Sequence, residues 1–102
     1  MSYSYTVLNN STNDMNLNGL EYYEFFFIDA SNSDMSIILP AGFDSQFFQF
    51  QRIDQTSNIV TFYTNSQNEN INGNTSLIFP INRYSQVIKY GDSWIMPLIA
   101  FN

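Results

Sequence analysis

The chain of 102 residues has room for one domain with one hydrophobic core. Its formal net charge is −6 and its only basic residues are Arg52, Arg83 and Lys89, which excludes the basic cluster that nucleic acid or an anionic membrane surface requires. The lack of Cys and His excludes disulfides, Cys/His zinc sites and His-based catalytic triads.

The N-terminal part of the chain predicts one strand and one polar segment. Tyr3–Leu8 alternates aromatic or branched residues with Ser and Thr, as a half-buried strand does. Asn9–Gly19 has almost no core material and is expected to form a loop or an arm that orders on a partner. We therefore expect an N-terminal strand and polar, docking arm over residues 1–20 and an all-β domain over residues 21–102.

The central part predicts four short strands separated by turn residues. In chain order they are Glu21–Asp29, Ser36–Leu39, Gln46–Ile53 and Ile59–Thr64. In the third, alternation places Phe48 and Phe50 on the face opposite Gln49. Arg52 and Asp54 follow at its end and are expected to pair with each other or to satisfy loop backbone.

The C-terminal part predicts three more strands, Ser76–Phe79, Tyr84–Tyr90 and Ser93–Leu98, with Trp94 anchoring the last one. Asn72-Gly73 favours a type I′ hairpin turn, and Gly91-Asp92 favours another tight turn. Short strands at this spacing predict an all-β fold, namely a small antiparallel β-sandwich, a barrel-like domain or an interlocked oligomer.

Carboxylate pairs are the remaining route to catalysis in a chain without His and Cys. The conceivable pairs are Asp29 with Asp34, Asp44 with Asp54, and Glu21 with Glu24. Nothing in the sequence selects one of them, and Asp residues in turns usually cap the local backbone.

Asn32–Asp34 and Asn65–Glu69 offer oxygen ligands but lack the spacing of a calcium loop. We expect no enzyme, no metal and no cofactor.

Aromatic residues support a carbohydrate-binding hypothesis, because such rings stack on sugars while Asn or Asp orient hydroxyl groups. The candidate residues are Tyr22, Tyr23, Tyr63, Tyr84, Tyr90 and Trp94, with Asn72 in a neighbouring loop. The competing interpretation, which we favour, places these rings in the core and in contacts between subunits.

Three pairs of segments between Ser36 and Leu98 resemble, in order and spacing, the C-terminal tip domains of bacteriophage tail fibres and related virion appendage or spike proteins. They are Ser36–Pro40 with Phe48–Asp54, Ser57–Phe62 with Ile71–Leu77, and Tyr84–Ile88 with Tyr90–Ile95. The resemblance implies a β-structured, usually trimeric head on a virion surface that attaches to host glycans or receptors. It implies no catalytic residues.

The resulting expectation is a virion structural protein: a homotrimeric, surface-exposed tip-like module for host attachment or particle capping, in contact with other virion proteins. The alternatives are a capsid decoration protein that stabilises the shell without a receptor, and a free carbohydrate-binding module. Met1–Tyr5 has no signal-peptide pattern, and no apolar run approaches the ~20 residues of a membrane helix. We therefore expect synthesis in the host cytoplasm, location in the virion and no membrane insertion.

Overall fold

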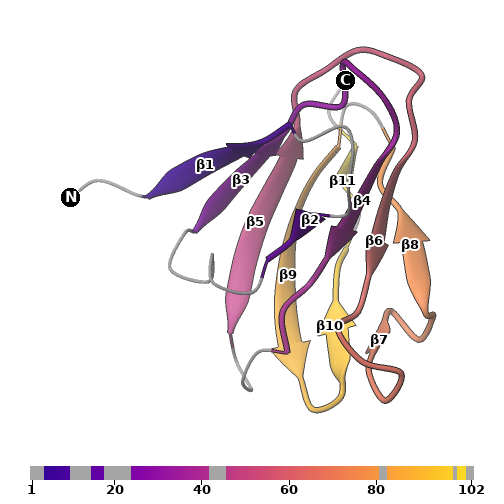
Figure 1. Ribbon diagram of the computed structural model, residues 1–102. Helices are drawn as coiled ribbons and strands as arrows, with labels where there is room; N and C mark the ends of the chain where they lie inside the picture. Colours follow the sequence, from indigo (N-terminus) through magenta and orange to yellow (C-terminus); the bar gives the residue numbers. More distant parts are fainter. Residues whose placement is uncertain are drawn as a thin grey trace.

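The computed structural model of the chain describes residues 4–9, 15–17, 24–41, 46–80, 83–97 and 99–100 (Figure 1). Every regular element in these residues is a β-strand, which confirms the predicted all-β class. No helix that is long and apolar enough to cross a membrane occurs among them.

The strands form two sheets. The large sheet has the spatial order β1 (Tyr5–Leu8), β3 (Phe25–Ile28), β5 (Phe47–Arg52), β9 (Arg83–Tyr90), β10 (Ser93–Ile95) and β7 (Asn70–Ile71), and β11 (Ile99–Ala100) also pairs with β9. The small sheet has the order β2 (Met15–Asn16), β4 (Met35–Ile38), β6 (Val60–Tyr63) and β8 (Ser76–Ile78).

From β1 to β9 the chain alternates between the two sheets, so strands that follow one another in sequence never pair there. Strands β1, β3 and β5 run parallel, with Tyr5 beside Phe25 and Phe25 beside Gln49, and β2, β4 and β6 run parallel in the other sheet. The expected antiparallel arrangement is wrong for this part, and the sheets are mixed. The physical reason is that each crossing through the other sheet returns the chain in its original direction.

The later strands close the sheets by antiparallel pairing of β5 with β9, β9 with β10, and β6 with β8. Asn72 and Gly73 have φ angles of 52° and 86°, and the Ile71 and Asn74 backbones exchange hydrogen bonds of 2.8 and 2.9 Å. Positive φ at both central residues confirms the predicted type I′ turn. Gly91, with φ 60°, turns the chain between β9 and β10.

The inward side chains of both sheets meet in one aromatic core. The ring centroids of Phe50 in the large sheet and Phe62 in the small sheet lie 4.8 Å apart, edge to face, and Phe48 stacks on the buried Trp94 at 5.8 Å. Leu8 and Leu17 belong to this core, so the described part of residues 1–20 contributes side chains to the fold. The rest of the expected arm, residues 10–14 and 18–20, lies outside the described residues.

A buried ion pair, the Arg52–Asp54 clamp, connects the end of β5 to the segments that follow β3 and β8 and to the segment that precedes β6. Arg52 Nε lies 3.0 Å from Asp54 Oδ1, and Asp54 also accepts the backbone N–H of Ala30 at 2.9 Å. The Arg52 guanidinium donates to the backbone carbonyls of Asn58 and, at 3.3 Å, Phe79. The expected pairing of Arg52 with Asp54 is confirmed, and Arg52 satisfies loop backbone as well.

Burial alone would raise the pKa of Asp54. The hydrogen bonds from Arg52, Thr56 and the Ala30 backbone, together with the Arg52 charge, outweigh burial and hold the pKa of this carboxyl well below its usual range. The carboxylate is therefore the stable form inside the protein.

Candidate functional site

The predicted ligand-binding residues lie on separate parts of the molecule. Trp94 is fully buried in the core, while Tyr84 and Tyr90 lie on the outer side of β9. Tyr63 ends β6 in the small sheet, and Asn72 occupies the turn after β7. Tyr22 and Tyr23 lie outside the described residues. The described candidates are therefore not gathered into one site, and Tyr63 lines a hollow in the surface.

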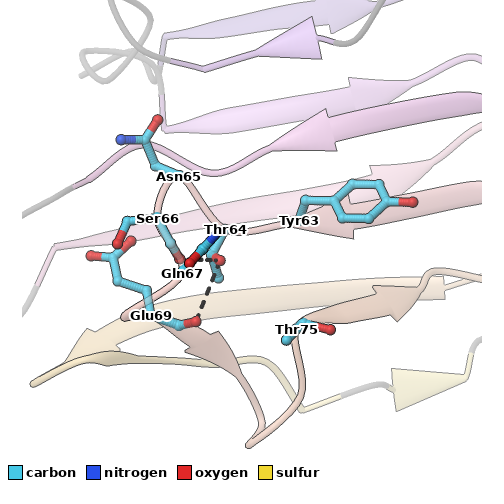
Figure 2. Close-up of a pocket in the computed structure, with 7 residues that line it drawn as sticks. All are labelled: Tyr63, Thr64, Asn65, Ser66, Gln67, Glu69 and Thr75. Carbon is cyan, nitrogen blue, oxygen red and sulfur yellow. Dashed lines mark hydrogen bonds between the residues drawn. The ribbon is translucent and has the colours of Figure 1, made fainter.

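This hollow lies where β6 ends and the next loop begins, and its volume is about 290 Å³. Its lining combines one aromatic ring with hydroxyl, amide and carboxylate groups (Figure 2). The lining residues are Tyr63, Thr64, Asn65, Ser66, Gln67, Glu69 and Thr75. The sequence marked Tyr63 as a stacking residue and Asn65–Glu69 as a source of oxygen ligands, but it did not indicate that Thr75 joins them.

The loop that forms the hollow is held by its own hydrogen bonds. Thr64 Oγ1 donates to the Ser66 carbonyl at 2.9 Å, and Ser66 Oγ accepts the Asn68 N–H at 3.0 Å. The Ser66 carbonyl also accepts the Glu69 N–H at 3.2 Å. Hydroxyl groups in such turns take over the role of backbone partners, so the loop has a defined shape without strand pairing.

A buried charged group lies under one side of the hollow. Glu69 Oε2 accepts a hydrogen bond from Lys89 Nζ, which also donates to the Ala41 carbonyl at 2.6 Å. The same ammonium lies 5.2 Å from the Trp94 ring centroid, within range of a cation–π attraction. Lys89 therefore neutralises Glu69 and connects the hollow to the core.

The second oxygen of the Glu69 carboxylate, Oε1, is buried and has no hydrogen-bond partner among the described residues. An unsatisfied buried acceptor costs about 1–3 kcal/mol.

Asn72 has a structural role in this arrangement. Its side-chain Nδ2 donates to the Met96 carbonyl at 2.8 Å, and its Oδ1 accepts the Met96 N–H at 2.8 Å. Both ends of the amide thus fasten the hairpin turn to the chain after β10.

The remaining two candidates lie on the outer side of the large sheet, where Tyr84 donates to Gln49 Oε1 and Tyr90 is 75% exposed.

Two of the carboxylates considered for catalysis or calcium binding accept hydrogen bonds from the backbone. Asp29 accepts the Ser31 N–H at 3.1 Å, and Asp34 accepts the Ile59 N–H at 2.8 Å. Asp44 and Glu21 lie outside the described residues. Within the described ranges, no group of three or more acidic side chains is placed to hold a metal ion.

No family model and no curated protein matches this chain. The function is therefore proposed from the hollow and from the sequence resemblance of Ser36–Leu98.

Proposed function

We propose that this protein is a non-catalytic module of a virion surface that attaches to a glycan through the hollow at Tyr63. The observation that carries the proposal is the combination, in the lining of one hollow, of an exposed tyrosine with hydroxyl and amide side chains.

The chemistry of the hollow fits a sugar better than an apolar ligand. A pyranose has an apolar face of C–H groups and a rim of hydroxyl groups. The Tyr63 side chain, 42% exposed, offers a surface for the apolar face. The hydroxyl groups of Ser66 and Thr75 and the amide of Gln67 can both donate and accept hydrogen bonds, as sugar hydroxyls require. The volume of the hollow corresponds to the small end of ligand pockets, roughly 300 Å³, which suits one sugar unit.

The virion location rests on the resemblance of Ser36–Leu98 to fibre-tip domains. A surface solubilised mainly by neutral polar side chains agrees with that environment, as does the low share of charged residues, 12%. The three-fold assembly and the sandwich-like packing that the resemblance implies stay predictions. Decoration of the capsid without a receptor is the second candidate, and it would leave the hollow without a ligand.

A glycan array followed by calorimetric titration of the bound sugars tests the proposal. Tyr63→Ala should weaken binding by about tenfold, because loss of a stacked ring costs about 1–1.5 kcal/mol. Tyr63→Phe should retain binding, since it keeps the ring. Tyr90→Ala is the matched control, because it removes a more exposed tyrosine that lies on the outer side of the large sheet and does not line the hollow.

Two outcomes contradict the proposal. Absence of binding to every glycan would exclude attachment by sugars, and binding to bare capsid shells in that case would favour decoration. An equal loss of affinity in Tyr90→Ala and Tyr63→Ala would show that the sugar does not bind specifically in the hollow.

A further inference from the structure

Strand β1 is the end strand of the large sheet among the described residues, at the outer side of the sheet in Figure 1. The carbonyls of Ser4 and Leu8 accept the N–H groups of Phe25 and Asp29, so the backbone groups of residues 4, 6 and 8 point toward β3. Successive residues of a strand direct these groups to opposite sides. The N–H and C=O groups of Tyr5 and Val7 therefore point to the outer edge.

This edge lacks the devices by which proteins usually prevent strand addition. Edge strands are commonly protected by charged side chains, proline, bulges or very short length. β1 has four residues, Tyr5-Thr6-Val7-Leu8, with no charge and no proline, and Tyr5 and Val7 are 61% and 42% exposed. The end strands β7 and β2 have two residues each, and β8 has three and is followed closely by Pro80.

We propose that β1 pairs with β1 of a second copy of this chain, antiparallel and about a two-fold axis. The axis passes between the two Thr6 residues, and Tyr5 of each copy lies opposite Val7 of the other. In this register Tyr5 and Val7 form the hydrogen-bonded pairs, because their backbone groups point to the edge. The contact forms about four main-chain hydrogen bonds and joins the two large sheets into one.

The occupant is a second copy because the edge is complementary to itself in length, in hydrogen-bonding pattern and in charge. Each chain has a net charge of −6, so copies approach most easily where no carboxylate faces the contact. β1 is uncharged, and so are Phe25 and Phe27 on the outer side of the adjacent strand. Within one copy Tyr5 already meets Phe27 edge to face at 5.7 Å, and Val7 of the second copy would extend this apolar row.

The contact is small, since it is confined to one short strand from each copy. A stable interface buries about 800 Å² on each partner, more than a single four-residue strand supplies. The dimer should therefore be weak in dilute solution and favoured where many copies are held close together, as on a particle surface. The inference does not depend on glycan attachment, because Tyr63 lies in the small sheet.

Sedimentation analysis from micromolar to millimolar concentration tests the association. The mass of the unaltered chain should rise from 11.8 kDa toward twice that value. Val7→Pro removes an edge N–H that makes no bond to β3, so it should weaken the dimer by about tenfold or more and leave the monomer folded by circular dichroism. Ile78→Pro is the matched control, because by the same alternation its N–H points away from β6 at the edge of the small sheet.

Cross-linking tests the register, and the natural chain contains no cysteine to interfere. In a non-hydrogen-bonded antiparallel pair the Cα atoms are about 4.5 Å apart, within the range of roughly 4.4–6.8 Å found in disulfides. Thr6→Cys should therefore form a disulfide-linked dimer under mild oxidation. Val7→Cys lies opposite Tyr5 and should cross-link about tenfold more slowly, and Ile78→Cys, at 60% exposure, should stay at background.

The proposal is overturned by a mass that stays at one chain throughout, by a trimer as the smallest assembled species, or by Val7→Pro associating as the natural chain does. Equal cross-linking of the Thr6→Cys and Val7→Cys variants would overturn the register. If Thr6→Cys does not fold, the mass measurements on the natural chain and on Val7→Pro decide. A Val7→Pro monomer that still binds glycan would show that the dimer and the proposed glycan attachment are independent properties.

Discussion

The two-residue turns and the parallel crossings of this molecule are specified by different kinds of interaction. At Gly91-Asp92 a two-residue turn sets the pairing of β9 with β10, and at Asn72-Gly73 such a turn closes a single bridge between Ile71 and Asn74. Where the chain winds between the sheets, from β1 to β6, each parallel pair joins residues far apart in sequence. The two-residue turns are therefore set by local chemistry, whereas the parallel crossings depend on the aromatic core and on the Arg52–Asp54 clamp.

The largest expected effect comes from breaking the clamp in the parallel part. Arg52→Ala leaves the buried Asp54 carboxylate without its cation and should lower the free energy of unfolding by about 3–5 kcal/mol. Denaturant unfolding followed by circular dichroism measures the loss. Arg52→Lys is the control, because it keeps the charge but not the paired N–H geometry. Its free energy of unfolding should lie between those of the natural chain and of Arg52→Ala. A cost below that of altering Asn72 would contradict the importance given to the clamp.

A smaller effect is expected at the Asn72-Gly73 turn. Asn72→Ala removes both hydrogen bonds to the Met96 backbone and places alanine at a φ of 52°, so it should cost about 1–3 kcal/mol. Asn72→Gly separates the two causes, because it loses the same hydrogen bonds but accepts the positive φ. Equal stability of both variants would show that the backbone angle contributes little. A melting curve for each protein gives the answer.

The smallest effect is the acid dependence of stability that Asp54 confers. Its pKa is lowered in the folded state relative to the ordinary value of 3.8, so its contribution is fully present above pH 3.8. The contribution is lost as the pH falls from there toward the folded pKa, because the unfolded chain then binds the proton first. Asp54→Asn should therefore show a flatter loss of stability below pH 4. A steepness identical to that of the natural chain would assign the acid sensitivity to other carboxylates.

The sequence predicted the faces of single strands well, because alternation is a local signal. Phe48 and Phe50 share one face of β5, as predicted, and the structure buries that face; the predicted Asn72-Gly73 turn also forms. Alternation carries no information on strand direction, however, so the parallel pairing was missed. The steps from Tyr5 to Phe25 and from Phe25 to Gln49 span 20 and 24 residues without any sequence repeat. Strands of two residues, β2 and β7, are too short to leave a pattern.

The candidate site was predictable only in part, for a similar reason. The composition of Asn65–Glu69 indicates a polar loop, and Tyr63 ends a strand that alternation identifies. The pairing of Glu69 with Lys89 and the burial of Trp94 depend on contacts across the core between residues distant in sequence. No local signal distinguishes the exposed Tyr63 from the buried Trp94, since both lie in short aromatic strands.

The burial of two of the three cations determines how the surface appears to an approaching molecule. Arg52 and Lys89 face Asp54 and Glu69 inside the protein, while Asp34 and Asp92 are exposed at turns. The potential of the described surface is therefore negative, and at physiological salt it extends about 8 Å into solution. Sialylated or sulfated sugars would be repelled over this distance, whereas neutral hexoses would not. Under the proposed attachment at Tyr63, long-range electrostatics would thus select among glycans before contact.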